Sequence, residues 1–184
     1  MKKIIKVKKR IFIVASACIF ALCLLSFTRP AAISVFSSFS QGERKLPIYC
    51  VDTPEKKISV SFDAAWGADD TDQLLQILAD NDVKATFFMC GYWVDKYPEE
   101  VKKISEAGHD LGNHSATHPH MNSLSSEQIK TELEQTHQKV LDLTGVSMNL
   151  FRPPFGEYNN TVIQTANDCG YYPIQWDVET TAMK

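Results

Sequence analysis

The stretch that decides the fold is "KKISVSFDAAWGADDTDQLLQILADNDVKATFFMC", residues 56–90. Residues 56–63 are rich in β-branched side chains and predict a strand. Residues 69–80 begin with acids, which suit a helix N-terminus, and carry an apolar stripe of Leu and Ile at helical spacing. Residues 84–90 are apolar again and predict a second strand. The order strand, helix, strand indicates a βαβ unit and therefore parallel strands.

The same alternation continues to the end of the chain. Further helices are expected over residues 97–108, 125–145 and 159–170, and further strands over 109–114, 147–152 and 171–178. Ser125 and Gln128 have the spacing of a capping box, and Gly145 is placed to end that helix. The pattern predicts an α/β fold whose parallel sheet or barrel is built from βα units.

Composition and charge narrow the classes of function. The chain has 184 residues, 44% of them hydrophobic and 10% aromatic, which is enough for one packed domain with a short appendage. The first ten residues hold six of the 19 bases and no acid, so the remainder has 13 bases against 22 acids. Binding to nucleic acid requires a basic surface, and we therefore expect no nucleic-acid partner.

The amino terminus predicts a membrane anchor. A cationic segment precedes an uncharged apolar run over residues 11–27, so we expect residues 1–28 to form a basic cytoplasmic segment and a transmembrane signal-anchor. No small-x-small motif directly follows the run, which favours an uncleaved anchor over a signal peptide. Residues 29–56 are expected to be a linker and 57–184 an extracytoplasmic domain, which would be secreted if the signal were cleaved.

The cysteines give little sign of a metal cluster of their own. Of five, Cys50, Cys90 and Cys169 follow the expected anchor and show no CxxC spacing, which argues against a zinc site made of thiolates. One disulfide could form among them, in a pairing that the sequence does not decide. Cys90, in "FFMCG", is interpreted as a small buried apolar side chain.

Chemically capable side chains stand at the ends of four predicted strands: Asp63, His114, Arg152 and Asp177. The carboxyl ends of parallel strands lie on one face, and sites in α/β proteins assemble there. We therefore expect a functional site at that face.

Two motifs extend this site. "HSATHPH", residues 114–120, places His114 and His118 at a spacing that brings two imidazoles to one side of a helical turn, with His120 as a spare. Imidazoles favour zinc, cobalt, nickel or iron over magnesium or calcium. "FRPPFGEY", residues 151–158, is a loop stiffened by two prolines, in which Arg152 is either a carboxylate partner or a surface arginine.

Together, the strand ending at Asp63, "KATFF", "HDLGNHSATHP" and "FRPPFG", in this order, resemble the polysaccharide deacetylase family, also called carbohydrate esterase family 4 or the NodB homology domain. The resemblance runs from about residue 57 to residue 184. It implies a distorted parallel β/α barrel that removes N-acetyl groups from amino-sugar polymers such as peptidoglycan or chitin, with a divalent metal, for which we expect zinc.

The resemblance also assigns roles. Asp63 would be the catalytic base, Arg152 would orient it, and His114 and His118 would bind the metal. The loop after Arg152 would hold substrate and oxyanion, with the Phe155 N–H as a donor; it comprises Pro153, Pro154, Phe155 and Gly156. Trp66, Tyr92 or Trp93 could stack on sugar rings, although core packing is the expected role for any single one.

Three departures from the family leave alternatives open. The family has a second aspartate, its third metal ligand, where this chain has Ala64; Asp69, Asp70 or His120 completes the set, or metal binds weakly. Ala182 and Met183 replace a closing acid and tryptophan, and the family's last strands, with the histidine that protonates the leaving amine, would follow Lys184. We therefore expect a partial domain. The alternative to a deacetylase is a catalytically impaired protein of the same fold that binds wall glycan.

Overall fold

The structure is a computed structural model and describes residues 43–179. The predicted anchor, half of the predicted linker (residues 29–42), Ala182 and Met183 lie outside these residues. Among the residues described, none of the helices has the length and apolar character needed to cross a membrane. A compact unit spans Lys45–Lys184.

Five parallel strands form one sheet, in the order β1-β2-β3-β4-β5. They are β1 (Ser61–Ala64), β2 (Thr86–Met89), β3 (Asp110–Asn113), β4 (Leu150–Phe151) and β5 (Tyr172–Pro173). Each strand therefore pairs with its neighbours in the sequence, as consecutive βα units require. The predicted α/β class with a parallel sheet is confirmed, although the strands are shorter than the sequence indicated.

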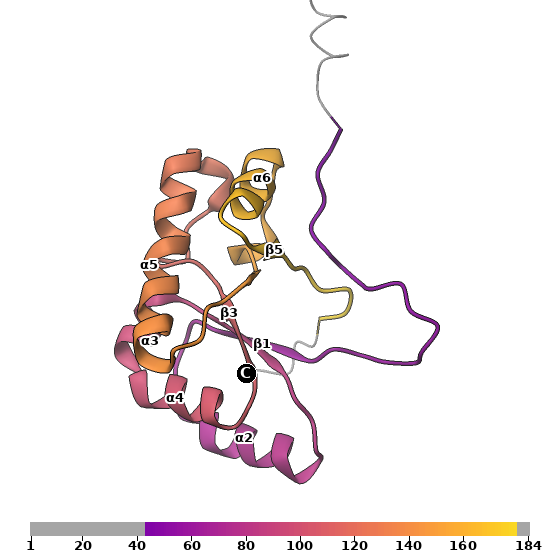
Figure 1. Ribbon diagram of the computed structural model, residues 1–184, viewed down its shortest axis with the longest axis vertical. Coiled ribbons are helices and arrows are strands. Elements are labelled where there is room, and N and C mark those ends of the chain that lie inside the picture. Colours follow the sequence, from indigo (N-terminus) through magenta and orange to yellow (C-terminus); the bar gives the residue numbers. More distant parts are fainter. Residues whose placement is uncertain (1–42, 180–184) are drawn as a thin grey trace, which may run out of the picture. The chain divides into compact units, whose positions relative to one another are not determined.

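The helices connect these strands. They are α2 (Thr71–Asp80), α3 (Gly91–Lys96), α4 (Pro98–Glu106), α5 (Ser126–Thr144) and α6 (Asn160–Asp168), with two 3₁₀ turns, η1 (Met121–Ser123) and η2 (Pro154–Gly156). Figure 1 shows α3, α4 and α5 along one side of the strands. Helix α3 was not predicted, because its six residues are too few to show a helical stripe.

Helix α5 begins and ends as its sequence predicts. The Ser125 side chain accepts from the Gln128 N–H, the Gln128 side chain accepts from the Ser125 N–H, and Gly145 follows in a left-handed conformation at φ 73°. Its buried face consists of Ile129, Leu133, Thr136 and Val140. The helix is thereby fixed against the sheet that carries the site.

One close approach in the sheet shapes that site. Gly112 on β3 pairs with Phe88 on β2, and a Cβ on Gly112 would come within 2.7 Å of Phe88 Cε1. Only glycine leaves room for the ring in this position. The Phe88 ring in turn lies 4.1 Å from the Arg152 guanidinium carbon, so the core packing reaches a residue at the carboxyl end of the sheet.

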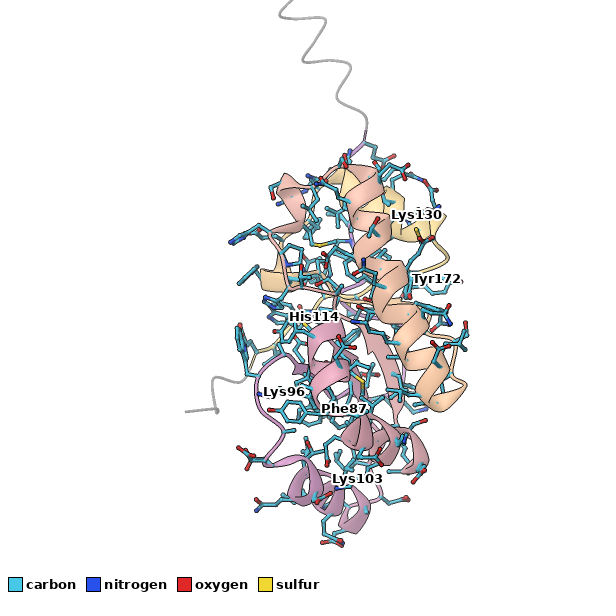
Figure 2. The ribbon with its side chains drawn as sticks, turned by 90° about the vertical axis from the view of Figure 1, so that its left-hand side faces the viewer. Phe87, Lys96, Lys103, His114, Lys130 and Tyr172 are labelled. Atoms are coloured by element: carbon cyan, nitrogen blue, oxygen red, sulfur yellow. The ribbon has the colours of Figure 1, made fainter. Side chains whose placement is uncertain are left out.

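In the side view of Figure 2, His114 lies between the Lys103 end and the Lys130 end of the ribbon.

Candidate active site

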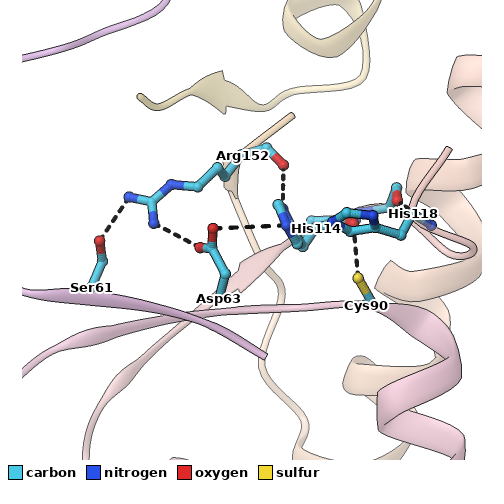
Figure 3. Close-up of polar contacts among 8 residues, drawn as sticks. Ser61, Asp63, Cys90, His114, His118 and Arg152 are labelled. Atoms are coloured by element: carbon cyan, nitrogen blue, oxygen red, sulfur yellow. Dashed lines mark hydrogen bonds and ion pairs between the residues drawn. The ribbon is translucent and has the colours of Figure 1, made fainter. Parts of the chain in front are cut away.

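Asp63 and Arg152 form an ion pair across the carboxyl end of the sheet (Figure 3). Asp63 lies in β1, and Arg152 directly follows β4. Arg152 Nη1 donates to Asp63 Oδ1 at 2.7 Å, and Nη2 donates to Ser61 Oγ at 2.7 Å. The Arg152 side chain is 6% exposed and that of Asp63 35%. The carboxylate is therefore oriented from its buried side and open to solvent on the other.

Aromatic rings hold the guanidinium in place. Its carbon lies 4.1 Å from the Phe88 ring centroid and 5.6 Å from that of Trp176, both within the range of cation–π attraction. Phe88 is also the register partner of Asp63 across β1 and β2. The planar head of Arg152 is thus fixed by rings and by hydrogen bonds together.

His114, directly after β3, has one ring nitrogen available at the site. Its Nδ1 lies 2.7 Å from the Arg152 carbonyl oxygen, and because a carbonyl can only accept, Nδ1 carries the hydrogen. The lone pair is left on Nε2, 3.8 Å from Asp63 Oδ2. Burial lowers the pKa of His114, which favours the neutral imidazole that a metal ligand must be.

His118 reaches His114 through a loop and not through the helical turn expected from the spacing. Residues 114–120 form no helix; Ser115 and His118 have left-handed backbones, at φ 69° and 55°. The two imidazole rings have centroids 5.0 Å apart. Burial also lowers the pKa of His118. The backbone turns so tightly here because Ser115 Oγ accepts from the His118 N–H at 3.0 Å.

Glu132, on α5, holds this loop from behind. One carboxylate oxygen accepts from the N–H groups of Ala116 and Thr117, each at 2.8 Å, and the other from Thr117 Oγ1 at 2.9 Å. Three bonds to one charged acceptor are a strong local constraint. This role of Glu132 was not predicted from the sequence, since only the packing of α5 brings the residue to the loop.

The third donor near the two histidines is Cys90. Within residues 43–179, the group of three possible ligand atoms that lie within 4.8 Å of one another comes from Cys90, His114 and His118. Cys90 is fully buried, and its Sγ lies 3.3 Å from the His114 carbonyl oxygen (Figure 3). Ala64 offers no donor. The sequence did contain a signal for Cys90, because this residue directly follows a strand just as His114 does.

The three alternatives proposed for the third ligand lie elsewhere. Asp70 is the N-cap residue of α2, with Asp69 immediately before it. His120 Nδ1 lies 3.0 Å from Glu157 Oε1, and its ring stacks on Phe155 at 4.5 Å between centroids. None of the three belongs to the group around His114 and His118.

The Arg-Pro-Pro-Phe-Gly loop presents an aromatic side chain beside the histidines. Phe155 has a left-handed backbone, at φ 58°, is 55% exposed, and has its ring centroid 4.5 Å from that of His118. Trp66, 79% exposed, has its centroid 6.1 Å from that of His118. Trp93 is buried in the core and donates through Nε1 to the Gly67 carbonyl oxygen at 2.7 Å. Asp177 is exposed, beyond the end of β5.

Comparison with known proteins identifies the family. The sequence model of the polysaccharide deacetylase family matches residues 51–174 of this chain. The chain belongs to the polysaccharide deacetylase family. The region matched contains all five strands and the candidate site residues from Asp63 to Phe155.

Characterised members have similar sequences and folds. The chain is 34% identical over 131 residues to the peptidoglycan-N-acetylmuramic acid deacetylase PdaA of Bacillus subtilis, covering 71% of this chain and 50% of that protein. The solved structure of PdaA superposes with a TM-score of 0.71 at 32% identity, covering 75% of this chain and 59% of that one. This chain spans about half the length of the curated relatives it matches.

The matches also include a protein of the same family described as inactive. BA3943 of Bacillus anthracis, described as a CE4 family pseudoenzyme, superposes with a TM-score of 0.70 at 36% identity, covering 72% of this chain and 47% of that one. A mutant of BA3943 is described as having restored enzymatic activity. Membership of this family therefore does not by itself establish activity.

Proposed function

We propose that this protein is a metal-dependent N-deacetylase of amino-sugar polymers, with peptidoglycan as its substrate at the outer face of the membrane. The observation that carries the proposal is the continuous set of contacts from Arg152 through Asp63 to His114 and His118. This set joins an oriented, partly exposed carboxylate to two neutral imidazoles. The names of its relatives support peptidoglycan as the polymer.

The donors at the site fit a divalent metal, and we propose zinc. Two imidazoles and a thiol are nitrogen and sulfur donors, which zinc prefers and magnesium does not. His114 is already in the tautomer that coordination through Nε2 requires, because its Nδ1–H is held by the Arg152 carbonyl. A bound divalent metal would supply an activated water near neutral pH and polarise the acetamide carbonyl.

Asp63 would accept the proton from the attacking water. General base catalysis requires a carboxylate that is ionised and aimed at the reacting atoms. Arg152 Nη1 holds Oδ1 through the 2.7 Å hydrogen bond, and this leaves Oδ2, on the His114 side, to take the proton. Asp63 would therefore use Oδ1 for the hydrogen bond that orients it and Oδ2 for the proton transfer.

The substrate would lie between exposed aromatic rings. Trp66 and Phe155 flank His118, and both are more than half exposed. Exposed aromatic faces are suited to stacking on the apolar faces of sugar rings. The Phe155 N–H, in the stiff loop that follows Pro154, would donate to the oxygen that becomes negatively charged as water adds.

Release of acetate from purified peptidoglycan by the full chain, loaded with zinc, tests this function. We expect Asp63→Asn to lower the rate by ~10² to 10⁴, because it removes the base but keeps a side chain of the same shape. Asp80→Asn is the matched control, since it removes the same charge from an exposed residue at the end of α2 that is not among the candidate site residues, and it should leave the rate unchanged. No release from the folded, zinc-loaded protein would overturn the proposal.

Ala64 and the pseudoenzyme relative favour a second candidate, a protein that binds wall glycan at the same exposed aromatic rings without cleaving it. This function predicts that the zinc-free protein sediments with insoluble peptidoglycan while releasing no acetate. Loss of glycan binding in Trp66→Ala would show that the glycan binds at these exposed rings. A chain that binds no glycan in either metal state would exclude it.

A further inference from the structure

We propose that Cys90 is the third protein ligand of the metal, supplying a thiolate where relatives are expected to supply a carboxylate from the position of Ala64. This inference rests on the proposed metal-dependent function and adds a residue to it. It changes the donor set from two imidazoles with an oxygen to two imidazoles with a sulfur, and therefore changes which metals the site accepts.

The backbone places Cys90 beside the position that lacks a donor. Cys90 directly follows β2, and its N–H donates to the Ala64 carbonyl oxygen at 3.1 Å. Ala64 pairs with Met89, so Cys90 lies one residue beyond the register partner of Ala64, at the carboxyl end of the adjacent parallel strand. His114 stands at the end of the next strand, where its N–H donates to the Met89 carbonyl oxygen at 2.9 Å, so Cys90 and His114 each follow a strand at this edge of the sheet.

The side chain points towards the histidines. Cys90 Sγ and one ring nitrogen from each of His114 and His118 all lie within 4.8 Å of one another. In a tetrahedral zinc site the Zn–S distance is about 2.3 Å and the Zn–N distance about 2.0 to 2.1 Å, so the three atoms must draw together only modestly. Three protein ligands would leave the fourth position for water, as in catalytic zinc sites.

The sulfur has polar neighbours although it lies in the core. An apolar side chain would need no polar neighbours, whereas Sγ contacts the His114 carbonyl oxygen at 3.3 Å and the Tyr92 hydroxyl. On coordination a sulfur–metal bond replaces the S–H bond, and the proton leaves to solvent.

The charge of the site would be conserved by this exchange. A thiolate carries the same single negative charge as the carboxylate it replaces, so Asp63 and Arg152 would experience a similar field. The thiolate is softer, however, and selects zinc or cobalt over manganese or magnesium. We expect this chain to bind zinc well and to bind manganese poorly.

Cobalt(II) spectroscopy on the full chain tests the ligand directly, because a cobalt–thiolate bond gives an intense near-ultraviolet charge-transfer band that imidazole and carboxylate ligands do not. We expect one equivalent of Co²⁺ to produce this band in the parent protein. Cys90→Ser should abolish the band and weaken zinc binding by at least about 100-fold, since loss even of outer-shell partners costs about 10- to 100-fold. Cys169→Ser, which alters a cysteine outside the site, should leave both unchanged.

A double variant guards against misfolding as the cause of any loss. Ala64→Asp combined with Cys90→Ser should regain tight zinc binding without the charge-transfer band, because a carboxylate then replaces the sulfur. Metal binding through His118 with no thiolate band in the parent protein would overturn the role of Cys90, yet leave metal-dependent deacetylation standing. No binding of Co²⁺ or Zn²⁺ by the folded parent would overturn both.

Discussion

Asp63 and Arg152 are buried to different extents, and this difference determines how much the loss of each side chain destabilises the fold. The arginine side chain is almost fully buried, and its Nε is a buried atom without a hydrogen-bond partner among the described residues, whereas the aspartate is about one-third exposed. Removing the acid leaves a positive charge in the protein interior. Removing Arg152 leaves the Asp63 carboxylate, which water can still reach.

This inequality predicts a specific order of stabilities. Asp63→Ala should lower the free energy of unfolding by about 3 kcal/mol, the size expected when one member of a largely buried pair is deleted. Asp63→Asn should cost clearly less, because its Oδ1 still accepts from Arg152 Nη1. Urea denaturation of the three proteins measures the order, and equal, small losses in both variants would show that the pair does not support the fold.

At the residue scale, the sequence identified the side chains at the ends of three strands but not their neighbours in space, and Asp177, predicted with them, lies exposed beyond the end of β5. Asp63, His114 and Arg152 were predicted from strand ends and from motifs, and the structure brings them together. Cys90 satisfied the same strand-end criterion but was interpreted as core, because buried cysteine is most often inert. The left-handed backbone of His118 could not be predicted, since it depends on hydrogen bonds within the loop.

At the scale of elements, α5 contributes to the site by positioning the histidine loop. Glu132 accepts three hydrogen bonds from Ala116 and Thr117, so the loop is tied to the helix. The capping box at Ser125 fixes where this helix starts and hence where Glu132 projects. The helix therefore acts on the proposed metal ligands His114 and His118 through the loop that carries them.

We expect Glu132→Ala to weaken zinc binding by roughly 10- to 100-fold, in line with other residues that orient metal ligands. Glu132→Gln, which keeps one carbonyl oxygen for the loop, should have an intermediate effect. Glu134→Ala is the matched control, because Glu134 lies on the same helix with its side chain 62% exposed. Zinc competition titrations on the folded variants measure the effect, and identical affinities for Glu132→Ala and Glu134→Ala would refute the positioning role.

The sequence predicted long elements better than short ones. The boundaries of α2, α5 and α6 were anticipated within about two residues, because an apolar stripe and end signals coincide in each. Helix α3 was missed, and the expected strand over residues 171–178 reduces to Tyr172–Pro173. The length of a strand depends on the neighbouring strand with which it pairs, and the local sequence does not contain that neighbour.

At the scale of the whole molecule, a buried histidine outside the group of proposed metal ligands couples folding to pH. His109 is 8% exposed, and its Nδ1 accepts from the Ala85 N–H at 3.3 Å. Burial lowers the pKa of His109 from 6.5, and the nearby Lys84 lowers it further, while Asp110 acts in the opposite direction. The unfolded chain therefore takes up a proton at a higher pH than the folded chain does.

The free energy of unfolding should consequently fall as the pH is lowered. The contribution of neutral His109 is fully present above pH 6.5 and is lost as the pH falls through its folded-state pKa. We expect His109→Asn, whose amide oxygen can accept from Ala85, to show a smaller loss of unfolding free energy between about pH 7.5 and about pH 5. Urea titrations at several pH values measure this, and parallel pH profiles for the two proteins would contradict it.

The most direct test of metal-dependent deacetylation is the release of acetate from purified peptidoglycan by the full chain before chelation, after chelation, and after zinc is restored. If the site at the carboxyl end of the sheet works as proposed, acetate release stops when the metal is removed and returns when one equivalent of zinc is added. Absence of release from a folded protein shown to contain zinc, or release that continues after complete chelation, would contradict the proposed function.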